Sequence, residues 1–307
     1  MTLHCAFIGF GKSTTRYHLP YVLHRKDRWQ VAHIYRRRAK PEEQAPQYSH
    51  IHFTSDLDEV LNDPLVKLVV VCTHADSHFE YAKKALEAGK NVLVEKPFTP
   101  TLEEAKTLFA LANSKGLTVT PYQNRRFDSC FLTTKKVIES GKLGELVEIE
   151  SHFDNYRPLA ETNPGGPQNG EFYGLGVHTL DQIISLFGRP DHVSYDLRSL
   201  RNKANPDDTF EAQLFYGDMK AIVKTSHLVQ IDYPKFIVHG HKGSFVKYGI
   251  DQQETSLKAN VMPGEPGFGA DDSVGELVYV NEAGEMVREA VPLESGDYGR
   301  VYDALYD

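Results

Sequence analysis

Short apolar runs alternate with helical patterns over the first 121 residues of the chain. The runs are rich in β-branched residues and mainly apolar throughout, as expected for strands that are covered on both faces. Strands that alternate with helices in this way indicate βαβ units and a parallel sheet. The predicted strands are residues 3–8, 29–35, 68–72, 92–94 and 117–120.

Capping signals place helices between these strands. Ser55 with Asp58, and Thr101 with Glu104, resemble capping boxes, in which a hydroxyl and an acid three residues later pair with the first N–H groups of a helix. The helix after Thr101 is expected to stop near Gly116, because glycine readily takes the left-handed conformation that ends a helix.

Beyond residue 121 the pattern changes. Residues 177–187 place their apolar side chains on one helical face, and a second helix is expected at 129–140. The runs around these helices favour a mostly antiparallel sheet. The predicted strands are residues 147–153, 210–216, 221–228, 236–239, 244–248 and 277–280.

The change of pattern divides the chain into two predicted domains, 1–121 and 122–307. Segments 162–174 and 262–272 are rich in Gly, Pro and Asp, and they are predicted to be loops that act as lids, substrate loops or interface arms. Residues 302–307 resemble the opening of a helix without its remaining turns, so an incomplete or frayed C-terminus is expected.

Composition fits two folded domains and narrows the classes of partner. The chain has 307 residues, 40% of them hydrophobic, and a formal net charge of −8, which gives no general attraction to nucleic acid or to an anionic membrane. With no predicted signal peptide or membrane span, we expect a cytoplasmic protein with a small-molecule substrate. Cys5, Cys72 and Cys130 are odd in number and lack CxxC spacing, so they are expected to be reduced core thiols.

A glycine-rich loop follows the first predicted strand and opens the first predicted helix. Its residues are Gly9, Phe10, Gly11, Lys12, Ser13 and Thr14. The first glycine suits a tight turn, and the second lets backbone approach a pyrophosphate at the helix N-terminus. Thr14 stands where a third glycine is usual, and its hydroxyl is expected near the phosphates. A plain glycine turn is the alternative, whereas a P-loop is excluded because its first glycine would have to be Ala6.

An arginine run ends the second predicted strand, roughly 20 residues beyond the loop, where a dinucleotide site contacts the adenosine ribose. Arg36 and Arg37 are the candidate ligands of a 2′-phosphate, because a guanidinium grips phosphate through two hydrogen bonds. NADP(H) is therefore the favoured cofactor, with NAD(H) as the alternative. A solvated basic turn is the structural explanation of the same run.

Further segments decide the class of protein. They are 69–74 with His78, the 91–97 strand ending in Glu95-Lys96-Pro97, 123–126, 156–158 and 176–181. In this order they resemble segments of the Gfo/Idh/MocA oxidoreductases, which are named after glucose-fructose oxidoreductase, inositol dehydrogenase and the MocA protein. The resemblance covers essentially the whole chain.

The resemblance implies a Rossmann domain and a C-terminal α/β domain whose large sheet often mediates assembly, with the active site between them. It thus implies a homodimer or higher homo-oligomer. Lys96 and His178 match the catalytic lysine and the proton-transfer histidine of the family, and Asp181 lies three residues on, where it could orient the histidine. The resemblance also implies cofactor contacts for Thr73, His74, His78, Glu95, Lys96 and Asn124, and substrate contacts for Lys96, Asn124, Arg126, Tyr156 and Asp181.

The chain departs from the family pattern at one position of the catalytic segment. Many relatives carry an aspartate four residues before the histidine, and here that position is Gly174. Asp181, Glu171 and Tyr173 are the candidates to compensate for the missing carboxylate. His239 and His241 lack a matching third ligand, so no metal is expected.

Two functions follow from these observations. The first is an NADP(H)-dependent oxidoreductase that transfers hydride to or from a hydroxyl or carbonyl carbon of a sugar, polyol or related small molecule. The second is a nucleotide-binding sensor or scaffold in which the change at Gly174 has weakened or abolished catalysis.

Overall fold

The structure, a computed structural model, describes residues 1–159 and 165–307, so residues 162–164 of the first predicted loop lie outside it. The chain forms two compact units. The first unit contains Met1–Gln123, Leu257–Pro266 and Tyr298–Asp307, and the second contains Asn124–Ser256 and Gly267–Asp297.

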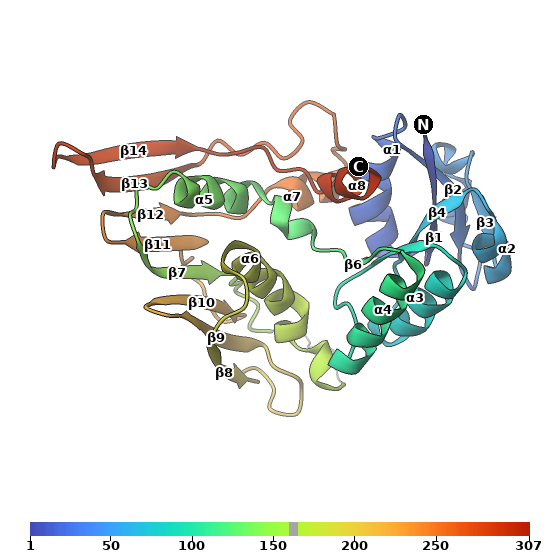
Figure 1. The fold of residues 1–307 in the computed structure, drawn as a ribbon, viewed down its shortest axis with the longest axis horizontal. Helices are drawn as coiled ribbons and strands as arrows, with labels where there is room; N and C mark the ends of the chain where they lie inside the picture. Colours follow the sequence, from blue (N-terminus) through green and yellow to red (C-terminus); the bar gives the residue numbers. More distant parts are fainter. Residues whose placement is uncertain (160–164) are drawn as a thin grey trace. The chain divides into compact units, whose positions relative to one another are not determined.

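The first unit is built on a six-stranded parallel sheet with the strand order β3-β2-β1-β4-β5-β6 (Figure 1). This order, with the first strand central, is that of a doubly wound nucleotide-binding fold, and it confirms the predicted parallel sheet. The strands are β1 Leu3–Ile8, β2 Trp29–Tyr35, β3 His52–Thr54, β4 Val66–Val71, β5 Asn91–Val94 and β6 Val119–Pro121.

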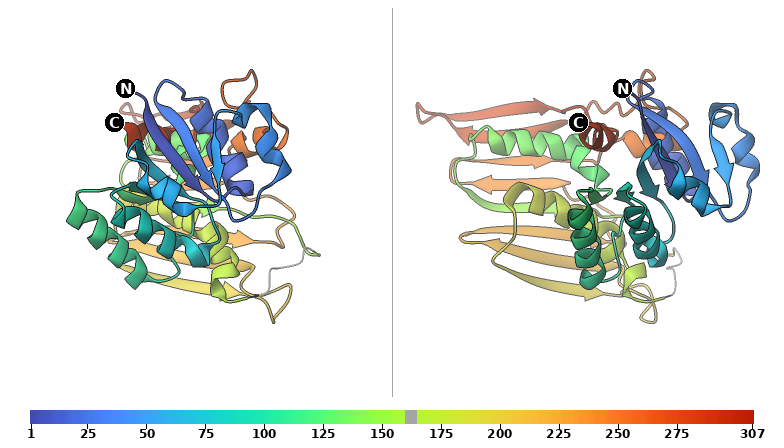
Figure 2. Two further views of the ribbon diagram at one scale, coloured as in Figure 1. Left: turned by 90° about the vertical axis from the view of Figure 1, so that its right-hand side faces the viewer. Right: turned by 45° about the vertical axis from the view of Figure 1, so that its right-hand side comes forward.

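Helices cover both faces of this sheet, which explains why its strands are apolar on both sides. Leu19 of α1 and Tyr302 of α8 belong to the core cluster on one face, and Ala82 of α3 and Leu108 of α4 to the cluster on the other. Figure 2 shows the same layers from two further sides. The helices are η1 Thr14–His18 (a π-helical turn), α1 Leu19–Leu23, α2 Leu57–Asn62, α3 His78–Glu87, α4 Leu102–Lys115 and α8 Arg300–Tyr306.

The capping predictions for this unit are half right. Thr101 and Glu104 form the predicted capping box, and Gly116 ends α4 in the left-handed conformation. The start of α2 was predicted one residue too early, because Asp56, and not Ser55, is the residue whose side chain accepts from the N–H group of Asp58.

The predicted division of the chain also needs correction. Residues 298–307 join the first unit, because Tyr302 is fully buried there and its carbonyl oxygen accepts a hydrogen bond of 3.1 Å from Trp29 Nε1. The expected fraying of residues 302–307 is not observed, since residues 300–306 form α8.

The second unit contains an eight-stranded sheet with the order β14-β13-β12-β11-β7-β10-β9-β8. All neighbours are antiparallel except β7 and β10, which confirms the predicted mostly antiparallel sheet. The strands are β7 Leu146–His152, β8 His192–Arg198, β9 Thr209–Tyr216, β10 Met219–Ser226, β11 Phe236–Gly240, β12 Gly243–Lys247, β13 Val274–Val280 and β14 Met286–Pro292.

Two helices of the second unit supply its core together with the sheet. Val137 of α5 (Ser129–Glu139) and Ile183 of α6 (Val177–Phe187) pack with Ile149, Leu214 and other inward side chains of the strands. A short helix, α7 (Gln253–Lys258), follows β12. The α/β fold class predicted from the sequence is confirmed in both units.

Candidate active site

The glycine loop leaves β1 at the carboxyl edge of the parallel sheet, where ligands of such sheets bind. Gly9 has a φ of +110°, and a Cβ atom there would lie 2.6 Å from the carbonyl oxygen of Cys72. A side chain is therefore excluded at Gly9 by both backbone conformation and space. A Cβ atom at Gly11 would meet no atom within 4 Å, so this glycine leaves open space beside the loop.

Thr14 has a different role from the one expected. Its side chain is fully buried, and its hydroxyl donates to the carbonyl oxygen of Gly9 over 2.8 Å. The residue therefore closes the loop onto the first helical turn, and its hydroxyl is not directed at a phosphate.

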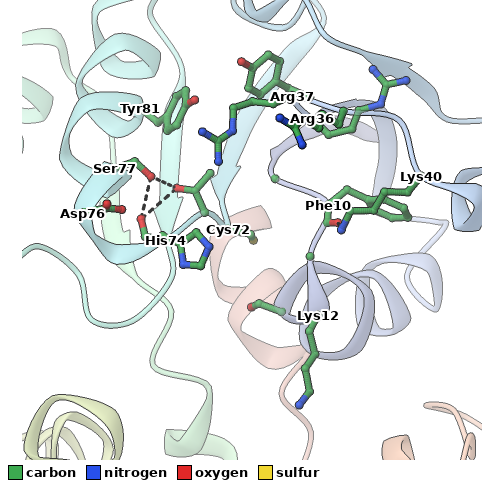
Figure 3. A pocket seen from close by; sticks show the side chains of 16 residues that line it. Phe10, Lys12, Arg36, Arg37, Lys40, Cys72, His74, Asp76, Ser77 and Tyr81 are labelled. Carbon is green, nitrogen blue, oxygen red and sulfur yellow. Dashed lines mark hydrogen bonds between the residues drawn. The ribbon is translucent and has the colours of Figure 1, made fainter. Parts of the chain in front are cut away.

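A cavity of about 820 Å³ opens above this loop. In Figure 3 the loop residues lie on one side of it, and Ser77 and Tyr81 of the β4–α3 region lie on the other. Its volume is in the range of sites for drug-sized ligands and cofactors. The lining residues are Gly9, Phe10, Gly11, Lys12, Ser13, Tyr35, Arg36, Arg37, Arg38, Lys40, Cys72, Thr73, His74, Asp76, Ser77 and Tyr81.

The cations that line the cavity differ in how they are held. Arg36 donates from Nε and Nη2 to the two carboxylate oxygens of Glu43 over 2.8 and 3.0 Å, and these bonds lower the pKa of Glu43. Lys40 donates to the carbonyl oxygen of Phe10 over 2.6 Å and lies across its ring (Figure 3). Arg37 has an exposed side chain on the same lining. Arg36 is thus committed to a carboxylate, whereas Arg37 is placed to meet an anion.

The segment after β4 supplies the opposite wall. Ser77 donates to Thr73 Oγ1 and to the carbonyl oxygen of His74, both over 2.8 Å (Figure 3). His78 does not line the cavity, contrary to its predicted cofactor contact. It is 1% exposed, and its ring nitrogens lie 2.8 Å from the carbonyl oxygen of Pro97 and 3.1 Å from that of Thr73. The histidine therefore links two backbone segments behind the cavity.

Glu95 turns inward at the end of β5 and is absent from the cavity lining, unlike the cofactor ligand that was expected. Its carboxylate accepts from the hydroxyl of Ser13, from His18 Nε2 over 3.1 Å, and from the backbone N–H of Lys96 over 2.8 Å. Burial alone raises the pKa of Glu95, but the hydrogen bonds and charges of these neighbours outweigh it and lower the pKa to about 2. Glu95 is thus an ionised, buried anchor for the residues around it.

The predicted catalytic residues of the second unit lie on and around α6. His178, in the first turn of α6, is 5% exposed. Both carboxylate oxygens of Asp181 accept from Arg126, over 2.7 and 2.6 Å, so this acid holds an arginine instead of the predicted histidine. Asn124 is buried, whereas Tyr156 is 52% exposed.

The neighbourhood of Gly174 contains a carboxylate from another position. A Cβ atom at Gly174 would lie 3.2 Å from Glu171 Oε2, so this carboxylate occupies the space next to the glycine. The other oxygen, Glu171 Oε1, lies 3.4 Å from His227 Nε2. Burial, helped by Arg201 and Arg157, lowers the pKa of His227 to about 4. Of the three candidates for compensation, Glu171 is the one that the structure shows against Gly174.

Several lining residues and one buried contact were not predicted from the sequence. Tyr35, Lys40, Asp76, Ser77 and Tyr81 line the cavity without having been predicted. Ser77 follows Thr73 by four residues in the segment that leads into α3, and this closeness in sequence is the signal that could have indicated it. No sequence signal indicated that Glu95 would meet His18.

Within residues 1–159 and 165–307, no group of three or more His, Cys, Asp or Glu side chains could hold a metal ion. No described helix is long and apolar enough to cross a membrane. The three cysteines are buried and free, and burial raises the pKa of Cys5 and Cys130 to about 12.

Two family models match most of the chain. The model described as "oxidoreductase family, NAD-binding Rossmann fold" matches residues 3–123. The model described as "oxidoreductase family, C-terminal alpha/beta domain" matches residues 135–307. Together they assign a nicotinamide-binding domain to the unit that contains the cavity.

Individual relatives agree with these models. The uncharacterized oxidoreductase YhhX of Escherichia coli is 85% identical over 306 residues, which cover 100% of this chain and 89% of that protein. A crystal structure of YhhX gives a TM-score of 0.98 and covers 99% of this chain and 89% of that chain. The scyllo-inositol 2-dehydrogenase (NADP(+)) IolW of Bacillus subtilis is 34% identical over 306 residues, covering 98% and 84%. The chain belongs to the Gfo/Idh/MocA family of oxidoreductases.

Proposed function

We propose that this protein is an NADP(H)-dependent oxidoreductase acting on a hydroxyl or carbonyl carbon of a sugar, polyol or related small molecule. The observation that carries the cofactor choice is the cavity lining, which has five cations, Lys12, Arg36, Arg37, Arg38 and Lys40, against the single acid Asp76. A lining of this charge favours the additional phosphate of NADP(H) over the free ribose hydroxyls of NAD(H). The similarity to a scyllo-inositol 2-dehydrogenase that uses NADP(+) supports both the cofactor and the substrate class.

The residues of the loop fit a dinucleotide. The space beside Gly11 and the N–H groups at the start of the first helix suit a pyrophosphate, and Lys12 adds a positive charge. Arg37 is assigned to the 2′-phosphate, with Arg38 as a second cation, because Arg36 is held by Glu43. When bound, the nicotinamide supplies or takes up the hydride.

Two side chains are assigned to the proton and to the charge on the reacting oxygen. Lys96 hydrogen-bonds that oxygen and stabilises the negative charge that develops on it. His178 donates or accepts the proton, for which an imidazole is suited near neutral pH. Glu171 supplies the carboxylate beside Gly174 that supports this histidine segment.

Polar residues of the second unit are assigned to the substrate hydroxyls. Asp181 fixes the guanidinium of Arg126 through two hydrogen bonds, and Arg126 is still 48% exposed in its side chain, so its remaining N–H groups are available. Asn124 and Tyr156 add an amide and a phenol to this set.

Cofactor choice is tested by calorimetric titration of NADP⁺ and NAD⁺ into wild type and Arg37→Ala. We expect Arg37→Ala to weaken NADP⁺ binding by about tenfold, the loss of one strong charged hydrogen bond, and to leave NAD⁺ binding unchanged. Lys106→Ala, which removes an exposed cation of α4 outside the cavity, is the matched control for net charge. Equal affinities for both nucleotides with no effect of Arg37→Ala would refute the NADP assignment.

Catalysis is tested by a screen of sugars, polyols and aldehydes that follows the absorbance of NADPH. A signal is expected that disappears in Lys96→Ala and in His178→Ala while both variants still bind NADP⁺. Full NADP⁺ binding without turnover on any compound would support the sensor or scaffold function instead.

A further inference from the structure

A chain of buried hydrogen bonds runs from the C-terminal helix to the glycine loop within the first unit. His18 Nδ1 lies 2.6 Å from the hydroxyl of Tyr302, and His18 Nε2 lies 3.1 Å from Glu95 Oε1. The same carboxylate oxygen accepts from the hydroxyl of Ser13, which lines the cavity. We call Tyr302, His18, Glu95 and Ser13 the Tyr302 chain.

The central histidine has no access to solvent. His18 is fully buried at the end of η1, and its ring centroid lies 4.0 Å from that of Tyr122 and 5.9 Å from that of Phe7. The edge-on contact with Phe7 and the tilted contact with Tyr122 restrict the plane of the imidazole, and its two nitrogens face Tyr302 and Glu95 at the same time. The histidine thus joins α8, which contains Tyr302, to the end of β5, where Glu95 lies.

The direction of the hydrogen bonds follows from the ionised state of the carboxylate. Glu95 has a pKa of about 2 and can therefore only accept hydrogen bonds at neutral pH. Nε2 of His18 must then carry a hydrogen that it donates to Glu95, while Nδ1 of the same ring lies within hydrogen-bond distance of the hydroxyl of Tyr302. Loss of that hydroxyl leaves Nδ1 without this partner, so the orientation of the ring toward Glu95 is then held at one end only.

Glu95 links the orientation of His18 to both sides of the proposed cofactor site. One oxygen holds the hydroxyl of Ser13 at the start of the first helix, and the other holds the backbone N–H of Lys96. A displaced carboxylate would therefore move the glycine loop and the proposed catalytic lysine together. Buried hydrogen-bonded chains of this kind hold their members in one arrangement when every group is paired.

We propose that Tyr302 and His18 are positioning residues of the cofactor site, and that the Tyr302 chain couples packing of α8 to the geometry of the glycine loop and of Lys96. The proposal rests on the proposed function, because it assumes that the cavity binds NADP(H). It assigns to the C-terminal helix an influence on cofactor affinity, although Tyr302 is absent from the cavity lining.

The test compares two variants that each remove one buried phenol hydroxyl from the same core cluster. Tyr302→Phe removes the bond to His18, whereas Tyr122→Phe removes a bond of 2.6 Å to the carbonyl oxygen of Tyr17, outside the Tyr302 chain. Calorimetric titration with NADP⁺ is expected to show about fivefold weaker binding for Tyr302→Phe, and a change of less than about twofold for Tyr122→Phe. Thermal unfolding measures how much stability each variant loses. If Tyr302 had a purely structural role, Tyr302→Phe would lose stability but would not lose NADP⁺ affinity.

Two further measurements keep the result decisive if Tyr302→Phe folds poorly. His18→Gln keeps an amide that can still donate to Glu95, whereas His18→Ala leaves both Glu95 and Tyr302 without this partner, so His18→Gln is expected to bind NADP⁺ more tightly than His18→Ala. The only tryptophan of the chain, Trp29, donates to the carbonyl oxygen of Tyr302, so its fluorescence reports the packing of α8. Addition of NADP⁺ is expected to change this emission in wild type and Tyr122→Phe, and to change it less in Tyr302→Phe.

The outcomes separate this inference from the proposed function. Wild type that binds neither NADP⁺ nor NAD⁺ would overturn both. Wild type that binds NADP⁺, with equal affinities in Tyr302→Phe and Tyr122→Phe, would overturn only the Tyr302 chain as a positioning device.

Discussion

The two glycines of the loop are expected to respond in opposite ways to the same substitution. Gly9→Ala places a methyl group 2.6 Å from the carbonyl oxygen of Cys72 on a backbone with a φ of +110°. Gly11→Ala places the same group in open space, with no atom within 4 Å, on a backbone without positive φ. The first change should act on stability, and the second on ligand binding.

The magnitude for Gly9→Ala follows from two costs. A left-handed backbone costs a residue with a Cβ atom about 1–2 kcal/mol, and overpacking against fixed backbone costs about 1–3 kcal/mol. The free energy of unfolding should therefore fall by about 2–5 kcal/mol. For Gly11→Ala neither cost applies, and lower entropy of the unfolded chain should raise this free energy by as much as about 1 kcal/mol.

Gly11→Ala should weaken NADP⁺ binding although it does not lower stability. Its methyl group enters the space assigned to the pyrophosphate, so NADP⁺ binding should weaken by a factor of about ten or more, as for a clash of roughly 1–3 kcal/mol. Urea unfolding and calorimetric titration with NADP⁺ on both variants provide the two measurements. The reasoning is refuted if Gly9→Ala is as stable as wild type, or if Gly11→Ala binds NADP⁺ normally.

Three further predictions concern other parts of the chain. Burial lowers the pKa of Lys235 from 10.5 to about 8, so between pH 8 and 10.5 the unfolded chain still holds this proton and the folded protein has lost it. The free energy of unfolding should therefore rise by up to about 3 kcal/mol over this pH range. Urea unfolding of Lys235→Met over this pH range should lack that rise, and an identical pH profile would contradict the assignment. Thr101→Ala removes the capping box of α4 and should lower the free energy of unfolding by about 1 kcal/mol, with Thr107→Ala, on the exposed part of the same helix, as the control; equal losses would argue against the cap. Glu171→Gln should lower kcat by about a hundredfold without changing NADP⁺ affinity, and adding Gly174→Asp should restore part of it; unchanged turnover in Glu171→Gln would remove Glu171 from the mechanism.

The strands with strong local patterns could be predicted from the sequence. The ranges of β1 and β2 agree with the predicted strands, because both runs are mainly apolar and end at clear turns. Strand β3 has only three residues, too few to establish a pattern. Strand β8 was missed although Val193, Tyr195 and Leu197 alternate with polar residues, and its side chains are exposed at the edge of the sheet.

The site was predictable where one short segment determines it. The glycine loop and the arginine run were found because their spacing along the chain sets their positions relative to β1 and β2. The roles of individual side chains depend on distant partners, which no local pattern encodes. Arg36 is held by Glu43, which lies seven residues further along the chain, and Glu95 is held by His18 at the end of η1.

The assembly of the first unit from three stretches of sequence has a consequence for the order of events during protein synthesis. Tyr302 and His18 are separated by 284 positions along the chain. At about 5–20 residues per second, a ribosome needs roughly 10 to 40 s to go from the end of the first stretch, Gln123, to Tyr302. During that interval the apolar residues around Trp29 are not yet covered by α8. The hydrogen bonds that Tyr302 makes with His18 and Trp29 therefore form only after translation has passed residue 302.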